Sequence, residues 1–209
     1  MHLALSPSSC PIVDGGASTL IKRLTSLNVA KLYLYEKLDV DGHFTKRCNI
    51  IVKMVEVVNH VNCLKLAGVF MEALSNATRN LSVKFERLTE LDIITTEYCQ
   101  WKSLSVMLDC SINLKVLKVE WAENSRNERW VDPKHIPKCL SSSLEEISIS
   151  GFTGLTNEME MIRFVLKHGE VIRRIKLEPS DECVENKFQM LRKISTFPRS
   201  SRTCVVQFD

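Results

Sequence analysis

Aliphatic residues recur along the chain as triplets, in which the second member follows the first by three positions and the third follows by two more. The six copies are Val29, Leu32 and Leu34; Val61, Leu64 and Leu66; Leu88, Leu91 and Ile93; Leu114, Leu117 and Val119; Leu144, Ile147 and Ile149; and Ile172, Ile175 and Leu177. Successive middle residues lie 32, 27, 26, 30 and 28 positions apart. Such regular spacing indicates internal structural repeats.

The last two members of each triplet predict a strand with one buried face, because residues two apart on a strand point to the same side. The first member enters the same core from the preceding turn. One such strand cannot bury its apolar face alone, but a stack of six can. The spacings lie near or slightly above the range of leucine-rich repeats. We therefore predict an α/β fold, an irregular leucine-rich-repeat solenoid with a curved parallel sheet and helices on the convex side.

The segments between the triplets must return the chain to the start of the next strand. Apolar spacing predicts helices that include residues 50–61, 101–108, 159–166 and 188–194. Asn157 is the expected N-cap of the third helix, and Gly169 is expected to end it. Weak alternation over residues 203–208 predicts a final strand.

The residue between the last two members of each triplet is expected to point out of the concave face, as is the residue after the triplet. The candidate binding residues at these positions are Tyr33, Tyr35, Lys65, Asp92, Lys118, Glu120 and Lys176. Tyr33 and Tyr35 are the preferred anchors, because tyrosine gives a large contact area at low entropic cost. The alternative is that all these residues are merely solvated.

Composition excludes several partner classes. The chain has 209 residues and a formal net charge of only +3, which does not favour nucleic acid or an anionic membrane as a partner. No apolar run is long enough to span a membrane, and the first residues do not resemble a secretory signal, so a cytoplasmic or nuclear location is expected. The eight cysteines are then expected to be free thiols.

A basic cluster, Arg173, Arg174 and Lys176, is a second candidate binding site for an acidic partner or a phosphate. The alternative is a solvated surface that nearby acidic residues partly neutralise.

Catalytic patterns are weak in this sequence. Asp39, Asp41 and His43 could ligate a metal ion, but the favoured interpretation is a simple acidic loop. His60 with Cys99 or Cys110 could form a thiol dyad, but nothing in the sequence places them together, and a buried cysteine is the favoured interpretation. We therefore predict no catalytic residues, no metal site, no cofactor and no enzyme activity. A hydrolase or metal enzyme is the alternative from another functional class.

The last third of the chain carries a series of short motifs. They are Trp130, Asp132-Pro133, residues 136–140, Ser142-Ser143-Leu144, residues 149–154, Glu158, residues 162–167 and residues 197–204. In this order they resemble the FBD domain of plant F-box/leucine-rich-repeat proteins. The expected organisation is an irregular N-terminal segment (1–19), leucine-rich repeats (20–121), a connecting loop (122–143) and an FBD domain that continues the solenoid (130–209).

The resemblance implies a function in protein recognition. Such proteins begin with an F-box that binds a Skp-type adaptor in a cullin ubiquitin ligase, and their repeats hold the substrate. No F-box precedes the repeats in this sequence, so a Skp-type adaptor is not an expected partner. The expected partner is an unidentified substrate protein. The alternative is a regulatory or non-functional fragment that competes with full-length relatives.

Overall fold

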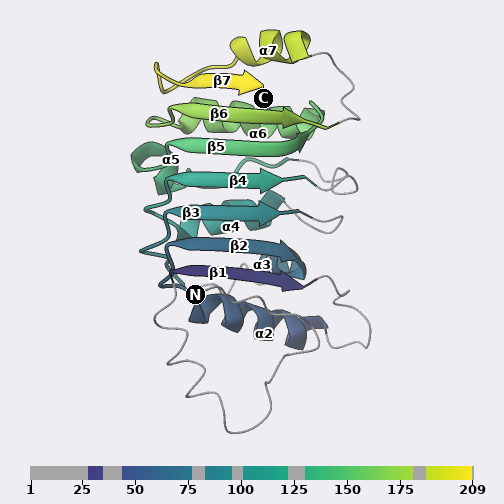
Figure 1. Cartoon of the computed structure of the whole chain (residues 1–209), viewed down its shortest axis with the longest axis vertical. Coiled ribbons are helices and arrows are strands. Elements are labelled where there is room, and N and C mark those ends of the chain that lie inside the picture. Colours follow the sequence, from purple (N-terminus) through teal and green to yellow (C-terminus); the bar gives the residue numbers. More distant parts are fainter. Residues whose placement is uncertain are drawn as a thin grey trace, which may run out of the picture.

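A computed structural model describes residues 28–34, 44–76, 83–95, 101–121, 130–180 and 187–208. Within these residues, seven parallel strands form one sheet in chain order (Figure 1). The strands are β1 (Val29–Leu34), β2 (Cys63–Gly68), β3 (Glu90–Ile94), β4 (Val116–Glu120), β5 (Glu146–Phe152), β6 (Arg174–Pro179) and β7 (Val205–Phe208). The helices are α2 (Phe44–Val57), α3 (Val69–Asn76), α4 (Trp101–Cys110), α5 (Lys138–Ser142), α6 (Thr156–His168) and α7 (Lys187–Ser195).

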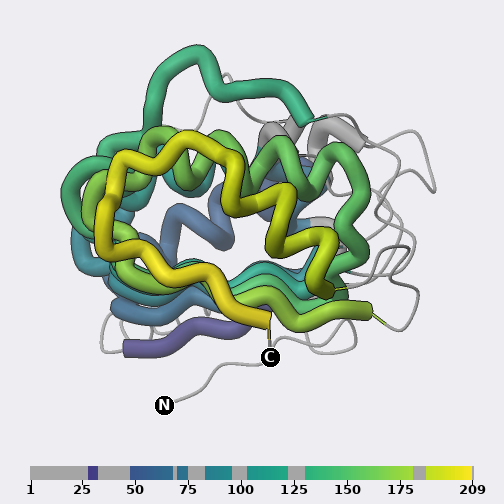
Figure 2. The backbone as a smooth tube through the Cα atoms, turned by 90° about the horizontal axis from the view of Figure 1, so that it is seen from above, coloured from purple at the N-terminus to yellow at the C-terminus, as the bar shows by residue number. Residues whose placement is uncertain are grey.

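The described helices lie on one side of the sheet, so each repeat turns once around a shared core (Figure 2). Alternate strand residues point into this core and are almost fully buried: Ala30, Leu32, Leu64, Leu66, Leu91, Ile93, Leu117, Val119, Ile147, Ile149, Ile175 and Leu177. The first triplet members Val61, Leu88, Leu114, Leu144 and Ile172 are also buried. The predicted α/β solenoid is therefore confirmed, and β7 confirms the predicted final strand.

The first triplet was assigned to the wrong residues. Ala30 pairs with Leu64, and Leu32 pairs with Leu66, so Ala30 and Leu32 occupy the repeat positions that were predicted for Leu32 and Leu34. The error has a simple cause, because a repeat search based on large aliphatic residues does not detect an alanine at a core position. Ala30 has no exposed surface.

The carbonyl of the residue before each strand joins neighbouring repeats. The Asn28 carbonyl accepts hydrogen bonds from the backbone N–H groups of Asn62 and Cys63 at 2.9 and 3.1 Å. The carbonyls of Asn62, Thr89, Lys115 and Glu145 each accept the same pair of bonds from the next repeat. This repeated bonding starts every strand at the same position and so fixes the register of the sheet.

The four predicted helices correspond to α2, α4, α6 and α7, whereas α3 was not predicted. It begins directly after β2, and its buried side chains Phe70, Met71, Ala73 and Leu74 follow an apolar strand without a polar break. A short continuous apolar run does not distinguish a strand from a helix. In α7, Phe188 is 72% exposed and Met190 takes the expected core position.

The start of α6 differs from the prediction. Leu155, not Asn157, is the N-cap, and its side chain has no acceptor group. Glu158 supplies the acceptor instead: its Oε2 receives hydrogen bonds from the backbone N–H groups of Thr153, Gly154 and Leu155 at 2.9, 2.8 and 3.2 Å, and from Thr153 Oγ1 at 2.9 Å. Burial raises the pKa of this carboxyl, while the hydrogen bonds act in the opposite direction.

The loop that supplies these donors depends on Gly151. Gly151 has a φ of +73° and lies where the register between β5 and β6 shifts. A Cβ atom there would lie 2.6 Å from the Trp121 carbonyl oxygen. Glycine therefore lets β5 bend, so that Phe152 enters the core and Thr153 turns toward Glu158.

We expect Glu158→Ala to lower the free energy of unfolding by about 3 kcal/mol, because it removes a buried charged acceptor and leaves four donors without it. Urea unfolding followed by circular dichroism measures the change. Glu160→Ala is the matched control, since Glu160 is exposed on the same helix and its loss should cost less than about 0.5 kcal/mol. Equal destabilisation by both variants would contradict a structural role for Glu158.

Candidate functional site

The sheet face turned away from the helices is the main candidate surface, and we call it the open sheet face. The strand register sorts its residues into rows that run across the strands. The middle row contains Lys31, Lys65, Asp92, Lys118, Ser148, Lys176 and Gln207. The row nearer the strand ends contains Tyr33, Ala67, Ile94, Glu120, Ser150 and Glu178.

The structure brings four of the predicted binding residues into one row, namely Lys65, Asp92, Lys118 and Lys176. Glu120 lies in the next row. Tyr33 pairs with Ala67, so its backbone belongs to the row of Glu120, and Lys31 takes the place beside Lys65 where Tyr33 was expected. Tyr35 lies outside the described residues. Ala67 is fully buried, so this second row is not continuously open to solvent.

Charges on the open sheet face pair across neighbouring strands. Lys65 Nζ lies 2.7 Å from Asp92 Oδ2, and Lys118 Nζ lies 2.6 Å from Glu90 Oε1. The hydrogen bond to Glu90 raises the pKa of Lys118. Glu90 was missed from the sequence because it precedes the first aliphatic residue of its strand, although strand alternation does place it on the same face as Asp92.

The predicted basic cluster lies at the start of β6, beside acidic residues of the preceding repeat. Arg173 Nη1 lies 3.4 Å from Glu145 Oε2, and Arg174 Nη1 lies 3.8 Å from Glu146 Oε1. Arg173 and Arg174 are exposed, and Lys176 is half-buried in the middle row of the open sheet face. The two arginines occupy the repeat positions of the two glutamates, so parallel stacking brings opposite charges together.

The described residues give no support to the metal site or the thiol dyad considered from the sequence. Asp39, Asp41, His43 and Cys99 lie outside the described residues. In the part of the chain that is described, no group of three or more His, Cys, Asp or Glu side chains is arranged to hold a metal ion. Burial raises the pKa of Cys110 to about 11 and that of Cys139 to about 12, so neither is a thiolate near neutral pH.

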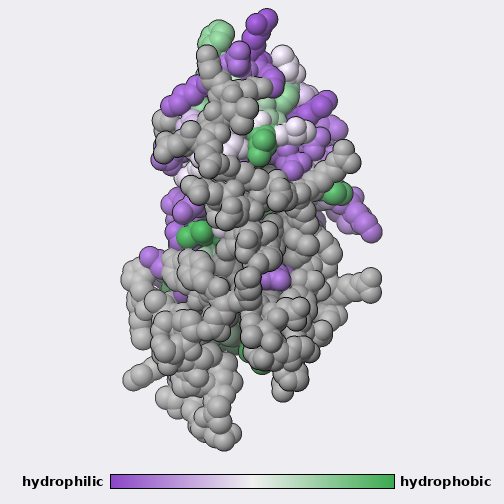
Figure 3. All heavy atoms as spheres, turned by 90° about the vertical axis from the view of Figure 1, so that its right-hand side faces the viewer, coloured by the Kyte–Doolittle hydropathy of each residue, from purple (hydrophilic) through white to green (hydrophobic). Residues whose placement is uncertain are grey.

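The surface at the carboxyl ends of the strands is shown in Figure 3. Its described part near the C-terminal end of the stack is mainly hydrophilic, with isolated hydrophobic residues among the polar ones. None of the described helices combines the length and the apolarity that a bilayer-spanning segment needs.

The amino-acid sequence is similar to those of plant proteins that contain an FBD domain. The FBD family model matches residues 132–177. The chain is 28% identical over 167 residues to a probable FBD-associated F-box protein of Arabidopsis thaliana, with 78% of this chain and 39% of the relative covered. Two F-box/FBD/LRR-repeat proteins of the same plant are 29% and 25% identical over 133 and 177 residues. These cover 61% and 81% of this chain, and 31% and 41% of the relatives.

The predicted resemblance to plant F-box/FBD/leucine-rich-repeat proteins is thereby confirmed. The match spans about two fifths or less of each of these relatives. No solved structure matches the chain.

We expect Cys110 and Cys139 to react slowly with iodoacetamide in the native protein at pH 8. A pKa of about 11 in place of 9.0 lowers the thiolate fraction of Cys110 by about 100-fold, and burial restricts access further. Peptide mass spectrometry at timed intervals measures alkylation at each site, and the protein unfolded in guanidinium chloride is the reference. Native alkylation as fast as in the reference would show that these thiols are accessible and reactive.

Proposed function

We propose that this chain is the substrate-recognition region of an F-box-type ubiquitin-ligase receptor and binds a substrate protein on its open sheet face. The relatives are named as F-box/FBD/LRR-repeat proteins. Proteins built from such repeats use their extended concave surfaces for binding. The similarity supports the class of function. The choice of surface comes from the geometry of the sheet.

One observation carries the choice of surface. All described helices lie on the other side of the sheet, which leaves the open sheet face with seven aligned strands (Figures 1 and 2). A solenoid presents such a face as an extended surface on a rigid scaffold, and each strand adds one residue to each row. A partner that crosses the strands therefore contacts residues from repeats that are distant in sequence.

The chemistry of this surface favours a partner with both charges. Lys65 and Asp92 neutralise each other, as do Lys118 and Glu90, so this part of the surface has little net charge. Ser148 and Ser150 supply small hydroxyl groups on β5 between the charged strands. Binding here depends on matching an alternating pattern rather than on long-range attraction to one sign of charge.

We expect the double variant Lys118→Glu and Lys176→Glu to lose the partner, because both changes reverse a charge in the middle row. Affinity capture from plant extract with wild type and variants, followed by quantitative mass spectrometry, measures recovery of each protein. Lys118→Glu removes a half-exposed ion pair worth at most about 1 kcal/mol and adds repulsion from Glu90 and Asp92, so circular dichroism is measured to show that the variant is folded.

The matched control is Lys138→Glu, which reverses an exposed charge on α5, on the helix side. Proteins recovered with wild type and with this control, but lost with the double variant, support binding on the open sheet face. Equal recovery with all three forms would place the partner elsewhere. If no protein is enriched over an unrelated bait, the proposed recognition function itself fails.

A further inference from the structure

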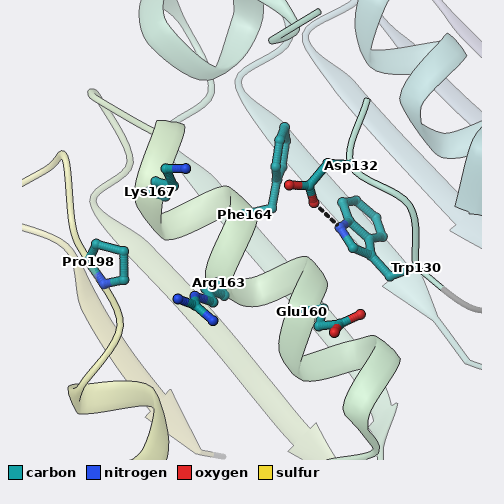
Figure 4. Close-up of a pocket in the computed structure, with 7 residues that line it drawn as sticks. All are labelled: Trp130, Asp132, Glu160, Arg163, Phe164, Lys167 and Pro198. Carbon is teal, nitrogen blue, oxygen red and sulfur yellow. Dashed lines mark hydrogen bonds between the residues drawn. The ribbon is translucent and has the colours of Figure 1, made fainter. Parts of the chain in front are cut away.

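A pocket lies on the helix side of the molecule, over the exposed surface of α6 (Figure 4). It has a volume of about 450 Å³, within the range of ligand-binding pockets. Its lining residues are Trp130, Asp132, Glu160, Arg163, Phe164, Lys167 and Pro198. Trp130 and Asp132 stand on one side of α6, and Pro198 stands on the other. The pocket therefore joins three segments that are separate in the sequence.

The Trp130 side of the pocket is held in place by several contacts. Trp130 Nε1 donates a hydrogen bond to Asp132 Oδ1 at 2.6 Å, and Trp130 is only 8% exposed. The indole centroid lies 5.6 Å from that of Phe164, whose ring lies 4.7 Å from His168. The Trp130 backbone N–H also approaches Asn157 Oδ1 at 3.4 Å. This wall is preorganised, so little ordering is required when a ligand binds.

The Pro198 side is also anchored. Arg199 Nη1 donates to the Cys204 carbonyl at 2.8 Å, and Ser200 Oγ donates to the Lys167 carbonyl, which ties the segment to the end of α6. Hydrogen bonds thus hold both walls: Ser200 joins the Pro198 segment to the backbone of α6, and Trp130 is joined to the side chains of Asp132 and Asn157.

Two cations lie between these walls. Arg163 and Lys167 are four residues apart on α6, so both side chains project from one face of the helix. Both are exposed, and no ion pair joins either of them to a described residue. The arginines at the start of β6 differ, because each has a glutamate partner.

The two carboxylates of the pocket are placed differently from the cations. Asp132 accepts the hydrogen bond from the Trp130 indole, so its carboxylate lies on the Trp130 side of the pocket. Glu160 lies about one turn before Arg163 on α6, toward the opposite end of the pocket from Lys167. An incoming anion is attracted to the end formed by Arg163 and Lys167 and is repelled from the Glu160 end, which gives the ligand one preferred direction.

We propose that this pocket binds an acidic peptide segment of a partner protein. A Glu or Asp carboxylate of the segment accepts charge-assisted hydrogen bonds from Arg163 and Lys167. The volume exceeds what one carboxylate needs, so neighbouring residues of the segment lie against Trp130 and Pro198. This site is separate from the open sheet face, and it does not depend on the function proposed for that face.

The Trp130 indole provides a direct test. The probe is a pool of short random peptides with Glu or Asp at every second position, and the matched pool has Gln or Asn there. The indole N–H resonance of Trp130 is followed in ¹⁵N-labelled protein, and its disappearance in Trp130→Phe identifies it among the three tryptophans. We expect a saturable shift with the acidic pool, weakened by salt, and none with the neutral pool.

The double variant Arg163→Gln and Lys167→Gln is expected to bind the acidic pool at least about tenfold more weakly, because it removes both charged donors. Arg173→Gln with Arg192→Gln is the matched control, since both are exposed arginines outside the pocket, and it should keep the response. Lys118→Glu on the open sheet face should keep it as well. Dispersed spectra confirm that each variant is folded.

Three results would overturn this proposal. The first is that the Trp130 resonance does not shift with the acidic pool at any concentration. The second is that it shifts equally with the neutral pool. The third is that the shift persists in the Arg163→Gln and Lys167→Gln variant. None of these results bears on recognition at the open sheet face, which is measured with different variants.

Discussion

The carbonyl that precedes each strand controls the geometry of the whole stack. When the Asn28 carbonyl binds the N–H groups of Asn62 and Cys63, the second strand must start level with the first, and the same bonding recurs in later repeats. A shift of one residue would move every core side chain to the solvent side. Register therefore determines both the buried aliphatic ladder and the neighbours on the open sheet face, where Lys65 meets Asp92.

Several residues that mark the FBD resemblance serve the structure around α6. Gly151 lets the end of β5 bend. Glu158 accepts hydrogen bonds from the backbone N–H groups of the loop between β5 and α6. Trp130 packs on Phe164 and bonds to Asp132, which holds the chain before α5 against the same helix. These contacts fix the position of α6, and that position creates the walls of the helix-side pocket. The exposed cations of α6 have no such structural contacts among the described residues.

The two candidate surfaces differ in their electrostatics for a physical reason. On the sheet, strands lie side by side and opposite charges on neighbouring repeats come within ion-pair distance, as Lys118 and Glu90 do. On α6, Arg163 and Lys167 belong to one helix, and the neighbouring helices do not bring a carboxylate against them within the described residues. The sheet thus compensates its own charges, whereas the pocket retains a cationic end that suits an acidic ligand.

The sequence by itself determined the repeat and most of the elements. Each strand must bury one face, so aliphatic residues recur at similar intervals, and this recurrence is detectable even though the loops differ in length. It did not determine the frame of β1, where Ala30 occupies a core position that carries no large-residue signal. Tertiary structure alone decided that Glu90 partners Lys118 and that Trp130 and Pro198 flank Arg163. The residues brought together in this way are about 28 or more positions apart, and spacing within one repeat contains no information about their proximity.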